Sequence, residues 1–183
     1  MAETVASKPS QGSPFWRFSL GFYRAPGVGE ACIALQDGAG VDVNLLLFLL
    51  WNATRNRALS ATDIEDLERQ VGAWRQAAVV PLRDIRRALK SPPPVVEPGT
   101  AEAFRTRIKA IELEAERLQQ EALYRLSQAR ELGHEVGSAL DAARANVSAY
   151  QDVCGQPFAA ASVEVLMAAF AQFAAGAVGK QGS

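Results

Sequence analysis

The segment 81–90 carries basic side chains at a spacing that could bind an anion. Its four basic residues recur at i, i+3, i+4 and i+7 and so share one helix face: Arg83, Arg86, Arg87 and Lys90. Arg75 lies about two turns earlier. Because guanidinium groups match phosphates and carboxylates with paired hydrogen bonds, we expect an anion site or a docking face for an acidic protein partner. The alternative is a solvated helix face near a C-terminus, where cations complement the helix dipole.

A second set of polar residues could line a pocket beside the apolar segment 45–51: Arg17, Asp37, Asp42 and Asn44. Such a pocket would bind, or act on, a small anionic or phosphorylated ligand. Asp42 and Asn44 are also explained as first-turn residues of a helix, because an aspartate before a helix caps its backbone amides. Nucleic acid is the less favoured anion for either set, because counterion release scales with the number of phosphates contacted.

Other residue types that often carry chemistry do not form a familiar site. His134 is the one histidine, and Cys32 and Cys154 are far apart with no second Cys or His near either, so neither zinc spacing nor a disulfide framework is present. The acidic cluster 63–68 suits the N-terminus of a helix electrostatically. We therefore predict no catalytic residue, no metal site and no cofactor, and we favour a non-enzymatic protein.

Composition indicates a globular protein. The 183 residues are 49% apolar and 21% charged with a formal net charge of −1, which argues against global disorder and against bulk attraction to nucleic acid or membranes. The first residues lack a basic-then-apolar pattern, and no window holds 18 uninterrupted apolar residues. We expect a cytoplasmic protein that does not enter a membrane.

The elements that must position these residues are helices. Residues 45–51 are all apolar, without a β-branched side chain, and Asp42 is a suitable N-cap, so we predict a buried central helix over 43–55 that ends near Asn56. Further helices are expected over 15–23, 28–36, 138–153 and 162–175. The predicted class is all-α, a single domain over 14–176 with six or seven helices and disordered tails at 1–13 and 177–183.

Two longer segments predict an antiparallel helical hairpin. One runs over 62–90, with a capping box from Thr62 to Glu65 and a break at Pro81, and the other over 100–131. The proline-rich stretch 91–99 connects them. The inner stripe of the second helix is expected to comprise these residues: Phe104, Ile108, Ile111, Ala115, Leu118, Ala122, Leu126 and Ala129.

Several strings resemble a family of uncharacterised proteobacterial proteins, DUF2390, also called the TIGR02444 family. They are Phe15-Trp16-Arg17-Phe18-Ser19-Leu20, Tyr23, Pro26-Gly27-Val28, Ala31-Cys32, Leu35-Gln36-Asp37, residues 42–51, Trp74, Val79-Val80-Pro81-Leu82-Arg83 and Arg86-Arg87-Ala88-Leu89-Lys90. The resemblance covers about residues 15–150. It implies a small cytoplasmic bacterial helical protein, and it brings no activity, catalytic residue or cofactor.

Two hypotheses follow. The leading one is an adaptor or regulatory protein that docks a protein partner through the hairpin and its basic face. The alternative is a protein that holds a small anionic ligand in the pocket near Arg17, Asp37, Asp42 and Asn44. A homodimer is compatible with both, and an apolar seam exposed on the hairpin would point to dimerisation.

Overall fold

The computed structural model describes residues 12–178, so most of the two predicted tails, 1–13 and 177–183, lies outside the described residues. Within that range the chain forms seven continuous helical segments and one short β-bridge, which confirms the all-α class. The elements, in order, are α1 Pro14–Tyr23, α2 Val28–Ala39, α3 Val43–Ala53, β1 Arg57–Ala58, α4 Ala61–Trp74, the π-helix η1 Arg75–Val79, α5 Val80–Ala88, α6 Pro98–Ala129, β2 His134–Glu135, α7 Ala139–Cys154 and α8 Ala160–Val178.

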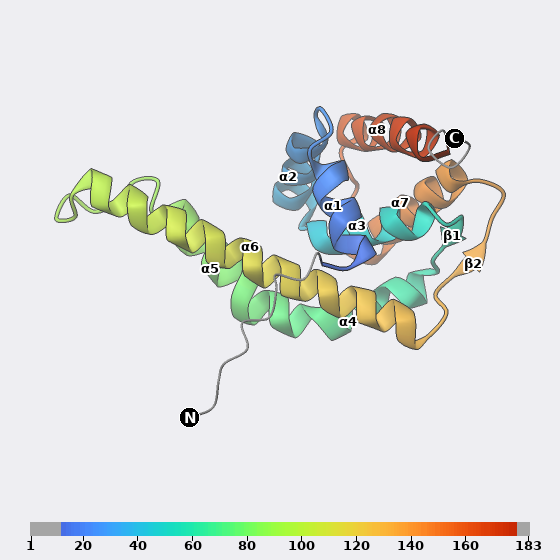
Figure 1. The fold of residues 1–183 in the computed structure, drawn as a ribbon, viewed down its shortest axis with the longest axis horizontal. Coiled ribbons are helices and arrows are strands. Elements are labelled where there is room, and N and C mark those ends of the chain that lie inside the picture. The colour runs from blue at the N-terminus through green and yellow to red at the C-terminus, as the bar shows by residue number, and fades with distance from the viewer. Residues whose placement is uncertain (1–11, 179–183) are drawn as a thin grey trace, which may run out of the picture.

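Helix α3 is the buried centre, as predicted. Every residue from Asn44 to Ala53 is buried, and α3 packs against α1, α2, α6 and α7, while α8 covers α2 and α7 (Figure 1). Asp42 caps its first turn by accepting hydrogen bonds from the backbone amides of Asn44 (2.9 Å) and Leu45 (3.4 Å). The helix ends at Ala53, two residues before the predicted end, and Asn56 follows in a left-handed conformation with φ of 56°.

A two-residue antiparallel bridge, which the sequence did not predict, joins the loops that follow α3 and α6. Arg57 pairs with Glu135 and Ala58 with His134. The bridge is too short to give an alternating pattern of apolar residues. Gly133 makes it feasible, because the residue has φ of 63° and a Cβ there would lie 2.2 Å from the carbonyl oxygen of Ala58.

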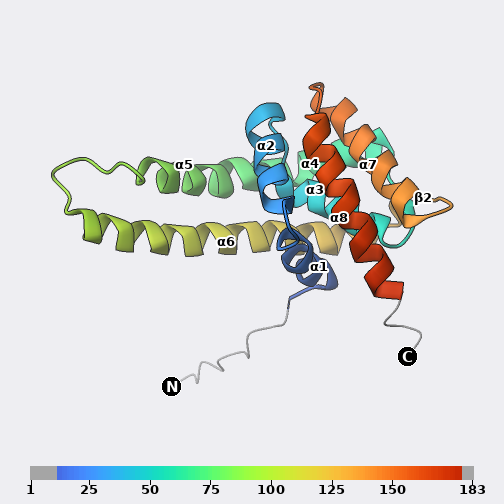
Figure 2. The same cartoon turned by 90° about the horizontal axis from the view of Figure 1, so that it is seen from above.

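The predicted hairpin is confirmed: α4, η1 and α5 form one continuous segment that runs antiparallel to α6. The distal part of this pair projects beyond the other helices (Figures 1 and 2). The predicted capping box at Thr62 was wrong, since Ser60 and Asp63 exchange the two bonds and α4 begins at Ala61. The N-cap of α6 is Glu97, three residues before the predicted start, and it accepts bonds from Gly99 and Thr100.

The break expected at Pro81 takes the form of η1. This π-helical segment ends two residues before Pro81, which lies in the first turn of α5. A proline cannot donate the backbone bond of a regular helix and crowds the preceding turn, so a wider turn accommodates it. As a result, Arg75 opens a π-helical turn beside the N-terminus of α3.

Candidate functional site

A buried polar cluster anchors the hairpin to the central helix. Arg75 donates from Nη1 to Oδ2 of Asp42 at 3.0 Å, and it also pairs with Glu68. Gln119 of α6 donates to the same Asp42 oxygen at 2.5 Å, and the backbone amide of Asp42 donates to the hydroxyl of Tyr150 in α7 at 2.9 Å. Burial alone would lower the pKa of Arg75, but the hydrogen bonds and charges of Glu68 and Asp42 outweigh it and raise that pKa.

Asn44 faces α6 instead of a cavity. Its side-chain amide donates to Oε1 of Gln119 (3.4 Å), and Gln120 donates to its oxygen (2.8 Å). All three side chains are buried. Of the two explanations open for Asp42 and Asn44, the structure supports the first-turn role for Asp42 and gives Asn44 a packing role against α6.

The interior of the hairpin is charged and polar. Arg83 pairs with Glu116 (3.1 Å) and with Glu112 (3.4 Å), and Arg86 donates from Nη2 to Glu112 (3.0 Å). Glu112 is buried, and burial also raises the pKa of Glu116. These carboxylates hold the two arginines that the sequence placed on a docking face.

The remaining basic residues of that face differ in their surroundings. Arg87 donates to Asp37 of α2 at 2.9 Å, and this hydrogen bond lowers the pKa of Asp37. Lys90 is exposed beyond the end of α5. Four of the five basic residues singled out in the sequence, all except Lys90, are therefore paired with carboxylates of the same chain.

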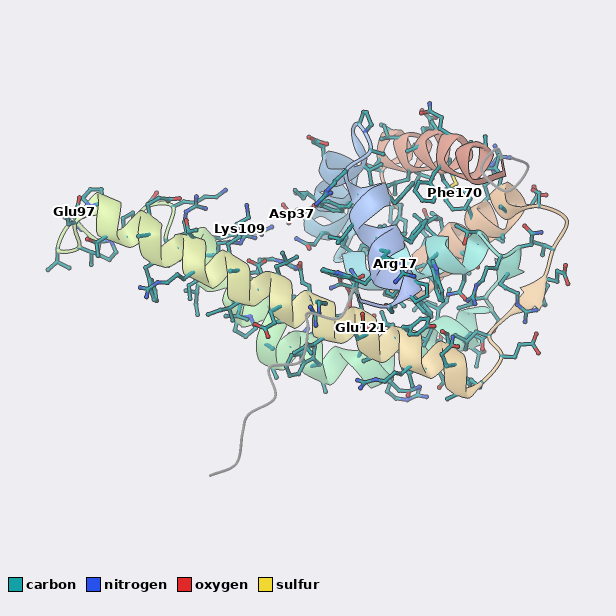
Figure 3. The ribbon with its side chains drawn as sticks, in the orientation of Figure 1. Arg17, Asp37, Glu97, Lys109, Glu121 and Phe170 are labelled. Carbon is teal, nitrogen blue, oxygen red and sulfur yellow. The ribbon has the colours of Figure 1, made fainter. Side chains whose placement is uncertain are left out.

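A cleft of about 250 Å³ lies between the α2–α3 turn and the η1–α5 segment. Its charged lining residues balance three against three and, apart from Asp84, come from the two predicted sets: Asp37, Asp42, Asp84, Arg75, Arg83 and Arg87. Arg17 is not among them, because it is exposed on α1 and donates to the carbonyl of Gly12 at 2.9 Å. Figure 3 shows Arg17 and Asp37 on separate helices, so the predicted pocket of four residues does not assemble as such.

The predicted inner stripe of α6 was wrong for three of its five large apolar residues. Ile108 and Ala115 are buried as expected, but Phe104, Ile111 and Leu118 are 43%, 48% and 47% exposed. Because α5 presents arginines to α6, the helix is rotated so that carboxylate and amide side chains face inward. The charge pairing across the connector was the signal that sequence reasoning missed.

The three exposed residues lie seven positions apart and therefore follow one line along α6. Trp74 extends this line onto the neighbouring segment: its indole donates to the carbonyl of Ala115 at 3.0 Å, on the turn between Ile111 and Leu118, and it is itself exposed. We call Trp74, Phe104, Ile111 and Leu118 the apolar edge. It lies beside the inward face of α6, whose glutamates meet Arg83 and Arg86.

The residues that could have carried nucleophilic or metal chemistry are placed in structural roles. Burial raises the pKa of the Cys32 thiol to about 12, so it is not a thiolate at neutral pH. His134 belongs to the β-bridge. Asp66 of the acidic cluster pairs with Arg130 at 3.3 Å, and the described residues contain no group of three metal-ligating side chains.

The model of a family described as "Protein of unknown function (DUF2390)" matches residues 14–123. The chain belongs to the DUF2390 family. The match ends earlier than the expected 150, at Leu123 within α6. It includes the cleft, the apolar edge and the polar cluster except for Tyr150, and it excludes α7 and α8.

No characterised protein and no solved structure matched the chain. Among residues 12–178, no helix combines the length and the apolar composition needed to cross a bilayer.

Proposed function

We propose that this DUF2390 protein is a non-enzymatic interaction protein, an adaptor or regulator, and that the apolar edge of its hairpin is the docking surface. One observation carries the proposal: α6 exposes large apolar residues at heptad spacing while burying Glu112, Gln119 and Gln120. A helix that only completed its own fold would bury the apolar line and solvate the polar one.

The position of the edge suits docking. In Figure 3, Glu97 lies at the far tip of the hairpin and Lys109 lies clear of the other helices, whereas Glu121 lies under α1. Phe104, which lies between Glu97 and Lys109 on α6, therefore belongs to the projecting part, and Ile111 follows Lys109 by two residues. Covering the exposed half of such side chains would contribute roughly 1 kcal/mol each. This supports association through a small, specific surface.

The basic face takes a lesser role in the proposal. Arg83 and Arg86 hold the hairpin together through Glu116 and Glu112, and Arg87 pairs with Asp37 of α2. Lys90 and the exposed part of Arg87 remain to steer a partner by charge. The free thiols of Cys32 and Cys154 suit a reducing compartment, and we place the protein in the cytoplasm.

Site-specific cross-linking tests the proposal. A photoreactive amino acid is introduced at Ile111 and, as the matched control, at Leu113, which is equally exposed (49%) but on another face of α6. We expect a defined adduct in cells from position 111 and not from position 113. The absence of an adduct at 111, or the same adducts at both positions, would contradict docking through the edge.

The cleft supports a second candidate function, the binding of a small charged ligand between Asp37 and the arginines of η1 and α5. The supporting observation is that both sets of predicted residues contribute to one cavity. Because each arginine there already has a carboxylate partner, an anion must displace Asp37 from Arg87. Stabilisation by millimolar phosphate that the variant Arg87→Ala loses would support this role, and equal melting temperatures with and without phosphate would remove it.

A further inference from the structure

We infer that the partner that covers the apolar edge is a second copy of the chain, packed antiparallel about a two-fold axis near Ile111. The inference rests on the proposed docking role of the edge and names its occupant. Two-fold contacts are isologous, so a surface can make one only if it is complementary to itself after reversal. The edge of α6 has this property.

The apolar residues of α6 are symmetric about Ile111. Phe104 lies seven residues before it and Leu118 seven residues after it. In an antiparallel pair centred there, Phe104 of one copy meets Leu118 of the other, and the two Ile111 side chains meet at the axis. The line spans about 21 Å, because fourteen residues of helix rise 1.5 Å each.

Charges beside the line select the same register. Arg107 lies between Phe104 and Ile111, and Glu114 lies between Ile111 and Leu118, both exposed on the same flank. Neither forms an ion pair with any residue that the structure describes; Arg107 lies over the ring of Phe104, 5.4 Å from its centroid. The antiparallel register brings Arg107 of each copy close to Glu114 of the other on the same side of the interface, whereas in a parallel two-fold pair these side chains lie on opposite sides of the interface and cannot meet.

The shape of the protein permits this arrangement. The apolar edge lies beside the face of α6 that carries Glu112 and Glu116, which meet the arginines of α5, so α5 does not cover it. Since the globular helices lie at one end of the hairpin (Figure 2), antiparallel packing places the two sets of globular helices at opposite ends of the pair. The Trp74 indole would border the line from the neighbouring segment of each copy.

Charge reversal tests the inference on the full chain. The single variants Arg107→Glu and Glu114→Arg are compared with wild type by sedimentation equilibrium over a concentration series. Lys109→Glu is the matched control, because Lys109 is an exposed base on α6 that lies on the opposite flank. Circular dichroism verifies that every variant is helical.

We expect wild type and Lys109→Glu to dimerise alike and each of the two edge variants to dimerise at least about tenfold more weakly. An equimolar mixture of Arg107→Glu with Glu114→Arg should recover a dimer, because each charge again meets its opposite. A wild type that is monomeric up to roughly millimolar concentration, a dimer unaffected by either substitution, or a mixture that does not associate would overturn the inference. In each of those cases, an adduct between position 111 and a different protein would still support the proposed docking role.

Discussion

Replacing Arg75 by alanine should destabilise the fold far more than replacing Arg87, although both belong to the basic set singled out in the sequence. The side chains of Arg75 and its partner Asp42 are 19% and 3% exposed, whereas those of Arg87 and Asp37 are 43% and 51% exposed. Arg75→Ala leaves a buried carboxylate without its counter-charge, and Asp42 keeps only its bonds from Gln119 and from backbone amides.

The structure sets the expected magnitudes. Removing one partner of a buried ion pair costs about 3 kcal/mol of unfolding free energy, because the other charge stays desolvated. An exposed pair such as Arg87–Asp37 contributes about 0.5 kcal/mol or less. Adding Asp42→Asn to Arg75→Ala should recover part of the loss, since it removes the uncompensated charge while keeping an acceptor for the cap.

Urea unfolding followed by circular dichroism measures these differences. Arg75→Ala and Arg87→Ala should differ by about 2 kcal/mol or more in unfolding free energy at equal denaturant slope. Equal and small losses for the two variants would refute the reasoning, because they would mean that Arg75 is as solvated as Arg87 and that the polar cluster does not anchor the hairpin.

Three further predictions concern single residues. Because the pKa of Glu116 is raised above its ordinary 4.5, its protonated form favours the fold below that pH and the benefit is lost as pH rises; the gain in melting temperature of Glu116→Gln over wild type should therefore grow between pH 4 and 7. A constant difference would contradict a raised pKa. Cys32, buried and with a pKa of about 12, should resist alkylation in the native protein and react once it is unfolded in urea, as mass spectrometry of the labelled peptides would show. Gly133→Ala should cost about 2 kcal/mol or more in urea unfolding, because its Cβ would overlap the carbonyl of Ala58, and a loss below about 0.5 kcal/mol would exclude that overlap.

The central helix and the existence of the hairpin were predictable from sequence for simple reasons. An uninterrupted apolar run must be covered on all sides, and a short helix-breaking connector between two long helical segments favours their antiparallel packing. The rotation of α6 was not predictable in the same way. Two adjacent faces of α6 could turn inward: one carries Phe104, Ile111 and Leu118, and the other, about one residue further round the helix, carries Glu112 and Gln119. The arginines of α5, on the far side of the connector, decide that the polar face is buried.

In the candidate site, too, the residues were predictable from the sequence but their contacts were not. Asp42 and Arg75 were each singled out, for capping and for charge, yet their contact joins positions 33 residues apart and depends on how the hairpin docks on α3. Sequence spacing identifies which residues share a helix face. Which of them will meet a residue of another helix, and which will stay solvated, is decided by packing between helices.

Disulfide formation between two copies at the proposed two-fold axis is a direct test of association through the apolar edge. In a Cys154→Ser background, where Cys32 is buried, Ile111→Cys is compared with Leu113→Cys, whose native side chains are 48% and 49% exposed. We expect mild oxidation to link Ile111→Cys chains into dimers and to leave Leu113→Cys chains monomeric, because the thiols of two copies meet only near the axis. Equal cross-linking at both positions, or none at position 111, would contradict it.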